Sequence, residues 1–439
     1  MIKLISCNSS QNLYKKINKL NSYLSIKNFY KSFYKKFKKL NHKFRFTSSI
    51  DLKYVNKQLK NIGNRKYLFF GIPFGIKDVI NTKNLNTEYG SAIFKNFLPG
   101  NNARVVDKIL EKQGIVFCKT TTAEFAVHFF PEQKTLNPYN KEHITGTSSS
   151  GSAVSVSCGA LPVSLATQTA GSIIRPASFC GVTGFKPSFG AIDRTGILKT
   201  TDTLDTVGLF ANNISLLKEV FKNLLASSKE YPYSKNFFEK KTKKNINITI
   251  ITEVFKPYNS YDNQVKKDFI FFCKNFLKNY KIINNKKFKF INNIHIHHNN
   301  IYCKSLAYYF ENLKKKKNKF SKAMIDMINI GNKVKKKDFS RSLQVQQSLS
   351  KKFNLLMHDC DFLFTPSTAS VAPKIGNVEK TDTCLIWTFL GAPAISLPIF
   401  YDEKTKLPFG LQIVAKRYED FRLLDFSEKI LMKVKNYKF

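Results

Sequence analysis

Acidic residues are scarce in this 439-residue sequence, which has 72 Lys and Arg against 30 Asp and Glu and a formal charge of +42. Residues 1–70 contain 17 basic residues and one acid, whereas residues 71–210 contain 13 basic and 10 acidic residues. Such an excess is typical of chains that bind nucleic acid or membrane surfaces. Because Lys, Asn, Ile, Phe and Tyr are abundant throughout, we favour solvated lysines encoded by an AT-rich genome, with an anionic partner as the alternative.

Closely paired cysteines and long apolar runs are also absent. The eight cysteines are scattered without a C-x-x-C pair, which fits a reducing compartment. The N-terminus lacks the apolar run of a signal peptide, and its first fifty residues are too poor in Arg for a transit peptide. The apolar run 385–400 is interrupted by Gly391 and Pro393 and is shorter than the ~20 residues of a membrane span. We therefore expect a cytoplasmic protein without a membrane span or internal repeats.

Small residues gather in two stretches of this otherwise bulky sequence, G-T-S-S-S-G-S-A at 146–153 and T-Q-T-A-G-S-I-I-R-P at 167–176. Such residues let the backbone approach a ligand closely. In the second stretch, successive N–H groups with little side-chain cover precede Ile173, where a helix could begin. This arrangement can form an oxyanion hole, and it makes Ser172 a candidate nucleophile.

A serine nucleophile needs a base, and neither stretch contains His, Asp or Glu. The candidate base is Lys77, which lies in the apolar run G-I-P-F-G-I-K-D-V at 71–79. This run predicts a buried strand and its end. Burial lowers the pKa of a lysine, so that a neutral amine is available to accept a proton.

The motifs G-I-P-x-x-I-K-D, G-x-S-S-x-G-S-A and T-x-T-x-G-S-x-x-R-P together resemble those of the amidase signature family. The resemblance covers about three quarters of the chain and is loose in the first seventy residues and at about 230–355. It implies a Ser-Ser-Lys triad in which Lys77 is the base, Ser148 the bridging serine and Ser172 the nucleophile.

The resemblance also implies a cis peptide bond before the bridging serine, here between Thr147 and Ser148. Most relatives have Gly in place of Thr147, so Ser149 and Ser150 remain alternatives for the bridging role. A second departure is Q-T-A at 168–170, where many relatives have Asp-x-Gly.

Amide hydrolysis through an acyl-enzyme on Ser172, without metal or cofactor, is the activity that the resemblance implies. Ser148 would relay protons between Lys77 and Ser172. The residues expected to hold the oxyanion and the substrate are Thr169, Ala170, Gly171 and Ser149. Arg175 would brace the nucleophile loop. The expected partner is a small-molecule amide that the sequence does not identify, and a homodimer is compatible with the sequence.

Two alternatives remain open. One is the ammonia-generating component of glutamyl-tRNA(Gln) amidotransferase, which would pass ammonia to a partner and whose tRNA would suit the basic charge. This chain has I-R-P at 174–176 and T-F-L-G-A-P at 388–393, where that component has I-R-Q-P and N-L-A-G-x-P, which disfavours it. The other alternative is an inactive basic interaction protein on the same fold. A self-sufficient amidase would have no obligate nucleic-acid partner.

Alternating apolar segments predict an α/β fold, with strands at 67–72 and 115–119 and a helix at 102–113. Segments 361–366 and 391–398 resemble family strands that rejoin the same sheet. We therefore expect one large domain with a mixed central β-sheet flanked by helices. A basic N-terminal segment, 1–65, would pack on it through amphipathic helices at 11–40. The amidase domain, 66–439, would comprise a catalytic core (66–215), a variable Lys/Asn-rich region (230–355) and returning strands (360–439).

Other polar and aromatic residues are weaker candidates. Glu124 follows a Thr run, which favours a capping-box role over a catalytic one. His295, His297 and His298 suggest a metal site, since 295 and 297 would share a strand face, but no third ligand stands nearby, and surface or turn positions are favoured. Three aromatic residues are candidates for an apolar pocket wall, each with core packing as the alternative: Trp387, Phe129 and Phe130.

Overall fold

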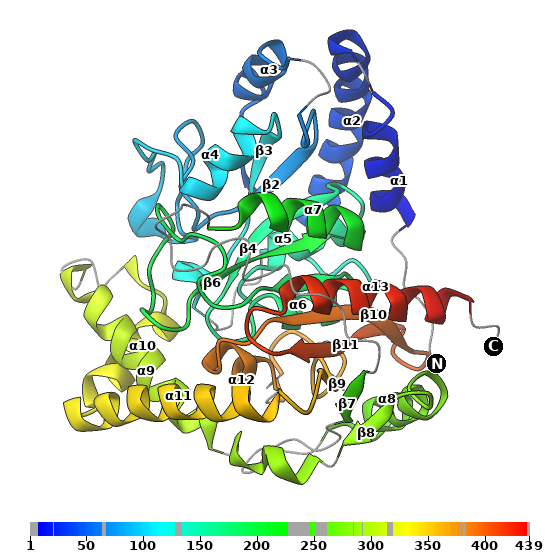
Figure 1. The fold of residues 1–439 in the computed structure, drawn as a ribbon. Coiled ribbons are helices and arrows are strands. Elements are labelled where there is room, and N and C mark those ends of the chain that lie inside the picture. Colours follow the sequence, from blue (N-terminus) through cyan, green and yellow to red (C-terminus); the bar gives the residue numbers. More distant parts are fainter. Residues whose placement is uncertain are drawn as a thin grey trace.

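The computed structural model describes residues 8–20, 22–63, 67–127, 134–211, 213–226, 246–250, 261–283, 285–291, 293–313, 319–377, 379–380 and 383–436. These residues form one mixed sheet of eleven strands with helices around it (Figure 1). The structure confirms the expected α/β fold with a large mixed central sheet.

Two groups of strands far apart in the sequence make up the sheet. The first group is β1 (Thr47–Ser49), β2 (Pro73–Lys77), β3 (Ile115–Thr120), β4 (Val163–Gln168), β5 (Gly184–Lys186) and β6 (Thr206–Ala211). The second group is β7 (Asn247–Ile250), β8 (Lys281–Ile283), β9 (Phe362–Pro366), β10 (Ala394–Asp402) and β11 (Leu407–Ala415). The order across the sheet is β1-β3-β2-β4-β6-β5-β10-β11-β9-β7-β8. The antiparallel pairing of β5 with β10 joins the two groups.

The central strand of the first group is β2, which runs parallel to β3 on one side and to β4 on the other. Parallel neighbours end at the same edge of a sheet, so the residues that follow these strands come together. All residues of β2, β3 and β4 are buried, as expected for strands covered on both faces.

The strand expected at 67–72 is wrong. Residues 67–71 form turns, and β2 begins only at Pro73. The N–H groups of Phe69 and Gly71 donate to the carbonyls of Lys112 and Gln113, each at 3.0 Å, instead of to a neighbouring strand. Gly71 has a φ of 69°, which a strand does not allow. The apolar side chains here are buried by packing against the end of a helix.

The helices are α1 (Asn8–Ile17), α2 (Tyr23–Phe44), α3 (Leu52–Lys60), α4 (Arg104–Glu111), α5 (Ser150–Ser157), α6 (Ile174–Phe179), α7 (Ile214–Leu224), α8 (Asn263–Phe276), α9 (Ile294–Tyr309), α10 (Lys322–Lys333), α11 (Lys336–Leu356), α12 (Cys384–Phe389) and α13 (Asp420–Asn436). They cover both faces of the sheet. Successive residues of a strand point to opposite faces. On β5, Gly184 faces Ala177 of α6, while the ring of Phe185 packs on Phe221 of α7, so α6 and α7 lie on opposite faces.

Helix α2 packs through one apolar stripe, with its lysines on the other side. The buried residues of the stripe are Ile26, Tyr30, Phe33, Phe37 and Phe44. Their spacing of three, four or seven residues keeps them on one face of the helix. Rings of this stripe contact Phe117 of β3. Within the described ranges, no helix combines the length and the apolarity needed to cross a bilayer.

The small-residue stretch at 150–157 forms α5, every residue of which is buried. Gly151 shows why small residues are required: a Cβ there would lie 2.5 Å or less from the backbone of residues 46 and 121. The helix therefore touches the chain around β1 and β3 directly with its backbone, and this contact fixes where the preceding residues 147–149 lie.

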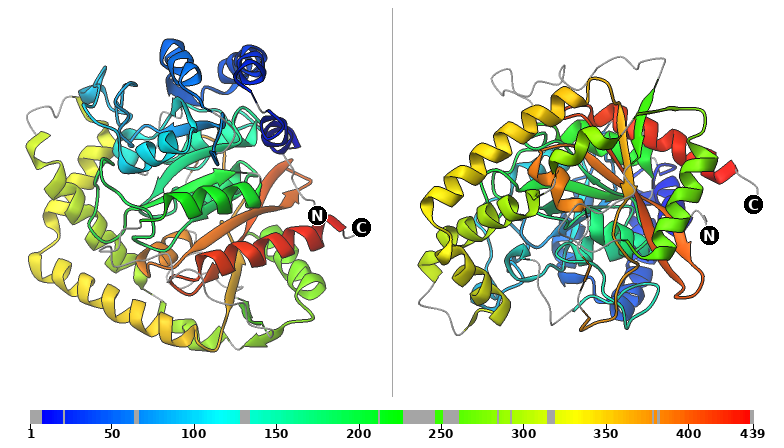
Figure 2. Two further views of the ribbon diagram at one scale, coloured as in Figure 1. Left: turned by 45° about the horizontal axis from the view of Figure 1, so that its top comes forward. Right: turned by 90° about the horizontal axis from the view of Figure 1, so that it is seen from below.

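Helices α9, α10 and α11 form a layer at one side of the molecule (Figures 1 and 2). The backbones of α9 and α10 come very close at Gly331, where an added Cβ would overlap the carbonyl of Cys303. Only glycine allows this approach.

We expect Gly331→Ala to lower the free energy of unfolding by roughly 1–3 kcal/mol, because the two helices must separate to admit the methyl group. Urea denaturation monitored by circular dichroism would measure the loss. The matched control is Gly100→Ala, because a Cβ at Gly100 meets nothing within 4 Å. Equal stability of the two variants would contradict the close packing of α9 on α10.

Candidate active site

Lys77 is the last residue of β2, and its side chain is fully buried. Burial lowers the pKa of the ammonium group to about 7, and the negative charge of Asp205 acts in the opposite direction. A large fraction of the Lys77 amine is therefore neutral near pH 7, so that the group is able to accept a proton.

The Lys77 amine lies among hydroxyl groups. Its Nζ is 2.9 Å from Ser148 Oγ, 2.8 Å from Ser149 Oγ and 3.0 Å from Thr167 Oγ1. Ser149 donates its own hydroxyl proton to the Thr167 carbonyl at 3.1 Å, so its oxygen is an acceptor toward Lys77. The Ser148 hydroxyl has no such carbonyl partner in the described part of the chain.

Ser148 lies between Lys77 and Ser172. Its Oγ is 3.0 Å from Ser172 Oγ, so the amine and the two hydroxyls form one continuous chain of hydrogen bonds. The peptide bond between Thr147 and Ser148 is cis in the structure. Of the two alternatives for the bridging position, Ser149 contacts Lys77 but is bonded to Thr167, and Ser150 begins α5.

Ser172 belongs to a loop, 169–172, between the end of β4 and the start of α6; this segment is called the nucleophile loop below. The side chain of Ser172 is 4% exposed. Within the described residues, the backbone N–H groups of Ala170, Gly171 and Ser172 donate to no protein acceptor. Three adjacent N–H groups are thus available to a ligand beside the serine hydroxyl.

Gln168, the last residue of β4, caps the helix that follows the nucleophile loop. Its Oε1 accepts hydrogen bonds from the N–H groups of Ile173 at 2.7 Å and Ile174 at 3.0 Å. These are two of the N–H groups that the start of a helix leaves unpaired. The side chain therefore holds both ends of the loop together, which the sequence did not indicate.

Arg175 lies in α6 and is almost fully buried. Its Nε is 2.7 Å from Glu379 Oε1, and its Nη1 is 3.5 Å from the carbonyl of Thr147, just before Ser148. The guanidinium therefore contacts a carboxylate and a carbonyl beside the two serines, and its bracing of the nucleophile loop remains a prediction.

Asp205 is a further charged residue near Lys77 that the sequence did not indicate. Its carboxylate accepts hydrogen bonds from the hydroxyl of Thr169 at 2.8 Å and from the N–H groups of Thr200 and Thr201 at 2.8 and 3.0 Å. It therefore fixes the Thr169 side chain at the start of the nucleophile loop.

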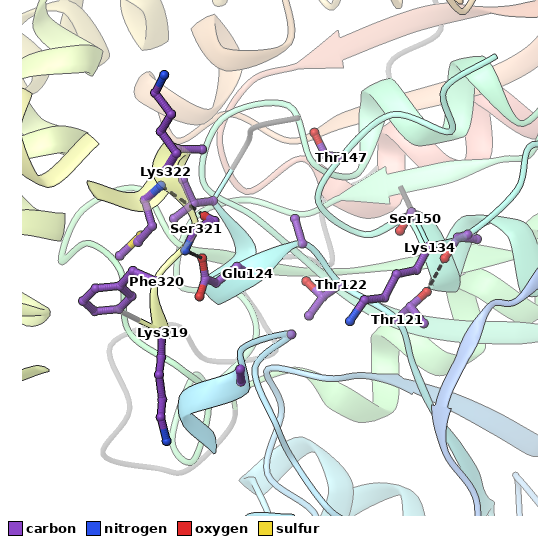
Figure 3. Close-up of a pocket in the computed structure, with 17 residues that line it drawn as sticks. Thr121, Thr122, Glu124, Lys134, Thr147, Ser150, Lys319, Phe320, Ser321 and Lys322 are labelled. Atoms are coloured by element: carbon purple, nitrogen blue, oxygen red, sulfur yellow. Dashed lines mark hydrogen bonds between the residues drawn. The ribbon is translucent and has the colours of Figure 1, made fainter. Parts of the chain in front are cut away.

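Two cavities adjoin these residues. The first, of about 490 Å³, is lined by Thr147 and Ser150 on either side of the Ser148–Ser149 pair and by residues 319–324 (Figure 3). In Figure 3 the side chains of Lys319 and Lys322 extend in opposite directions. The second cavity, of about 440 Å³, is lined by Thr167 and Thr169. Each has room for a small molecule.

The expected capping-box role of Glu124 is wrong. Glu124 lies in a short 3-10 helix, η2 (Glu124–Ala126), and its two carboxylate oxygens accept hydrogen bonds from Ser91 Oγ and from the N–H of Ser321, each at 2.9 Å. Figure 3 shows the bond to Ser321. Glu124 thus ties the segment after β3 to the start of α10.

The remaining candidates lie in other settings than expected. His295 and His297 are on the helix α9, not on a strand, and His295 and His298 are buried. No group of three or more His, Cys, Asp or Glu that could hold a metal ion occurs among the described residues. Trp387 is fully buried and packs against Phe353 in the core. Phe129 and Phe130 lie outside the described residues.

The mixed sheet, and the lysine and serine motifs carried on it, define an α/β protein of the amidase class. The Amidase family model matches residues 26–424, and the chain belongs to this family. The match confirms the resemblance inferred from the motifs.

Curated relatives and solved structures agree with this assignment. The chain is 28% identical to the GatA-type component of glutamyl-tRNA(Gln) amidotransferase from Borreliella burgdorferi, over 88% of this chain and 89% of that protein. It is 30% identical to the corresponding protein of Borrelia garinii subsp. bavariensis, with the same coverage of each chain. A crystal structure of an amidase shares the fold with a TM-score of 0.80 at 22% identity, over 94% of this chain and 96% of that one.

Proposed function

We propose that the protein hydrolyses a carboxamide to a carboxylic acid and ammonia or an amine, with Ser172 as nucleophile. The observation that carries the proposal is the unbroken chain of hydrogen bonds from Lys77 through Ser148 to Ser172. Beside its end lie three backbone N–H groups without an acceptor among the described residues. An amine of lowered pKa, a relay hydroxyl and a nucleophilic hydroxyl are the parts that activation of a serine requires.

The contacts of Lys77 favour proton flow toward its amine. In the neutral amine, the two N–H groups donate to the oxygens of Ser149 and Thr167, and the lone pair then faces Ser148. Ser148 can donate its proton to that lone pair and accept one from Ser172. When the amine is protonated, the same hydrogen bonds run in the opposite direction, so one geometry serves both halves of the reaction.

In acylation, Ser172 Oγ forms a bond to the amide carbon while its proton passes to Ser148 and the proton of Ser148 passes to Lys77. The oxyanion of the tetrahedral intermediate is stabilised by the N–H groups of the nucleophile loop. The C–N bond then breaks, and Ser148 protonates the departing nitrogen while Lys77 returns a proton to Ser148. Water, deprotonated along the same route, releases the acid from Ser172.

The proposal is tested with a fluorophosphonate probe and a panel of amides. We expect mass spectrometry to locate one adduct on Ser172, and the purified chain to release ammonia from at least one of acetamide, propionamide, benzamide and glutamine. Ser148→Ala should slow the labelling strongly, because the proton route is broken. An adduct on another residue, or undiminished labelling of the Ser148 variant, would overturn the proposed relay.

A second candidate function is that of a glutaminase component that delivers ammonia to a partner protein. The curated relatives named above, which belong to glutamyl-tRNA(Gln) amidotransferases, favour it. The charge of +42 would suit a complex that handles tRNA. The chemistry at Ser172 would be unchanged, with glutamine as the amide.

The same panel separates the two candidates. Turnover of several simple amides by the isolated chain supports a self-sufficient amidase. Turnover of glutamine alone, rising when the other components of an amidotransferase are added, supports the ammonia-delivering function.

A further inference from the structure

Three consecutive carbonyl groups of the nucleophile loop are each held by a donor from outside the loop. The acceptors and donors are Thr169 O with His298 Nε2, Ala170 O with Thr388 Oγ1, and Gly171 O with the N–H of Arg175, each pair at 2.9 Å. The third donor is part of the first turn of α6. The first two are side chains of α9 and α12, far from the loop in the sequence.

Holding a carbonyl fixes the direction of the next N–H group. In a planar trans peptide group, the C=O and the N–H of the following residue point in opposite directions. Among the described residues the cis bond is that between 147 and 148, so the peptide groups of the loop are trans. The hydrogen bond to Thr169 O therefore directs the N–H of Ala170, and the bond to Ala170 O directs the N–H of Gly171.

We infer that His298 and Thr388 are positioning residues that aim the N–H groups of Ala170 and Gly171 at the oxyanion formed on attack by Ser172. The inference rests on the proposed hydrolysis and assigns to it two residues outside its motifs. Both side chains are buried, 4% and 0% exposed, so water cannot readily replace them as donors. They act through the backbone and do not touch the substrate.

Thr388 is itself oriented by Gln168. Gln168 Nε2 donates to Thr388 Oγ1 at 2.9 Å, and Gln168 Oε1 is occupied by the first N–H groups of α6. The Thr388 oxygen therefore accepts from the amide, and its proton is directed to Ala170 O. Gln168 and Thr388 are two of the positions at which this chain departs from the patterns of its relatives, and they are hydrogen-bonded to each other.

His298 has one protonation form that fits its contact. A carbonyl oxygen only accepts, so Nε2 carries the proton. Burial lowers the pKa of the imidazole to about 4, despite the opposing effect of the bond to Thr169, so the ring is neutral near pH 7. A glutamine side chain places its amide donor at about the reach of Nε2.

The test measures fluorophosphonate labelling of Ser172, which does not require the natural substrate. We expect Thr388→Val to lower the maximal labelling rate by roughly 10- to 100-fold, with little change in the probe concentration that gives half the maximal rate. Thr388→Ser should restore most of the rate, because it keeps the hydroxyl. The matched control is Thr365→Val: Thr365 also accepts from a glutamine, Gln412, and donates to a carbonyl, each at 2.8 Å, but in β9.

A second pair tests α9. His298→Leu should slow labelling by a similar factor and His298→Gln should recover it, while His297→Leu, on the neighbouring residue, should leave the rate unchanged. Melting temperatures of all variants separate loss of fold from loss of rate.

Rates equal to wild type in Thr388→Val and His298→Leu, or donor-retaining variants as slow as the apolar ones, would overturn this inference and leave the proposed function standing. Failure of the wild-type chain to label at Ser172 would overturn the proposed function, and this inference with it.

Discussion

Ser172→Ala is expected to lower amide turnover by roughly 10⁴-fold or more, because no acyl-enzyme can form without its hydroxyl. The side chain is small and makes its one described hydrogen bond to Ser148, so the melting temperature should change little. The measurement is kcat for the best amide of the panel, together with the thermal melt of the same preparation.

The matched control is Ser427→Ala. Ser427 is also fully buried, but its hydroxyl donates to the carbonyl of Leu423 within α13. Its loss should leave kcat within about twofold of wild type. Turnover by Ser172→Ala at the rate of this control would end the proposal that Ser172 is the nucleophile.

Lys77→Met is expected to lower kcat/KM by roughly 10³- to 10⁴-fold, because it keeps the length of the side chain but removes the base. In the wild type, kcat/KM should rise with pH through a midpoint near 7, since only the neutral amine accepts the proton and its pKa is about 7. The residual activity of the variant should lack this step. A pH profile of both proteins provides the measurement.

The same substitution should stabilise the fold, with a defined dependence on pH. The pKa of Lys77 is about 7 in the folded chain and about 10.5 in the unfolded one, so between these values the unfolded chain binds more protons. Wild-type stability therefore gains as pH rises from 7 to 10.5, by at most about 5 kcal/mol before lost hydrogen bonds are counted. The advantage of Lys77→Met should shrink over that interval.

Lys186→Met serves as a control for the loss of a buried amine. Lys186 is also fully buried, in β5, and its pKa is likewise lowered by burial to about 7. This variant should alter stability but keep the wild-type pH profile of kcat/KM. If Lys186→Met removed the step near pH 7 and Lys77→Met kept it, the base would have been assigned wrongly.

Much of the fold was predictable because local patterns and tertiary structure agree. The alternating apolar segments gave β3 and α4 close to their observed bounds, and motif resemblance placed residues 361–366 and 391–398 in the sheet that holds β2. The run at 67–72 misled because burial alone does not make a strand: its N–H groups bond to the turn after α4. Apolar composition reported the burial and not the hydrogen-bonding partner.

At the candidate site, residues within motifs were predictable and those brought in by topology were not. Lys77, Ser148 and Ser172 lie in recognisable patterns, and the structure places their side chains in contact. His298 and Thr388 stand 129 and 218 residues from the carbonyls that they hold. The one early signal was that two motif departures, at 168 and 388, occur in the same chain.

The hydrogen bond from α9 to the nucleophile loop has a consequence for the modularity of this family. Residues 230–355 resemble the relatives loosely, which makes them an inviting block for recombination between homologues. One imidazole from this block holds Thr169 O, however, and Gly331 of α10 sets how closely α9 is backed. A chimera that imports the block inherits its loop geometry from the donor, so productive crossovers should either carry a hydrogen-bond donor at position 298 or exchange α9 and the nucleophile loop together.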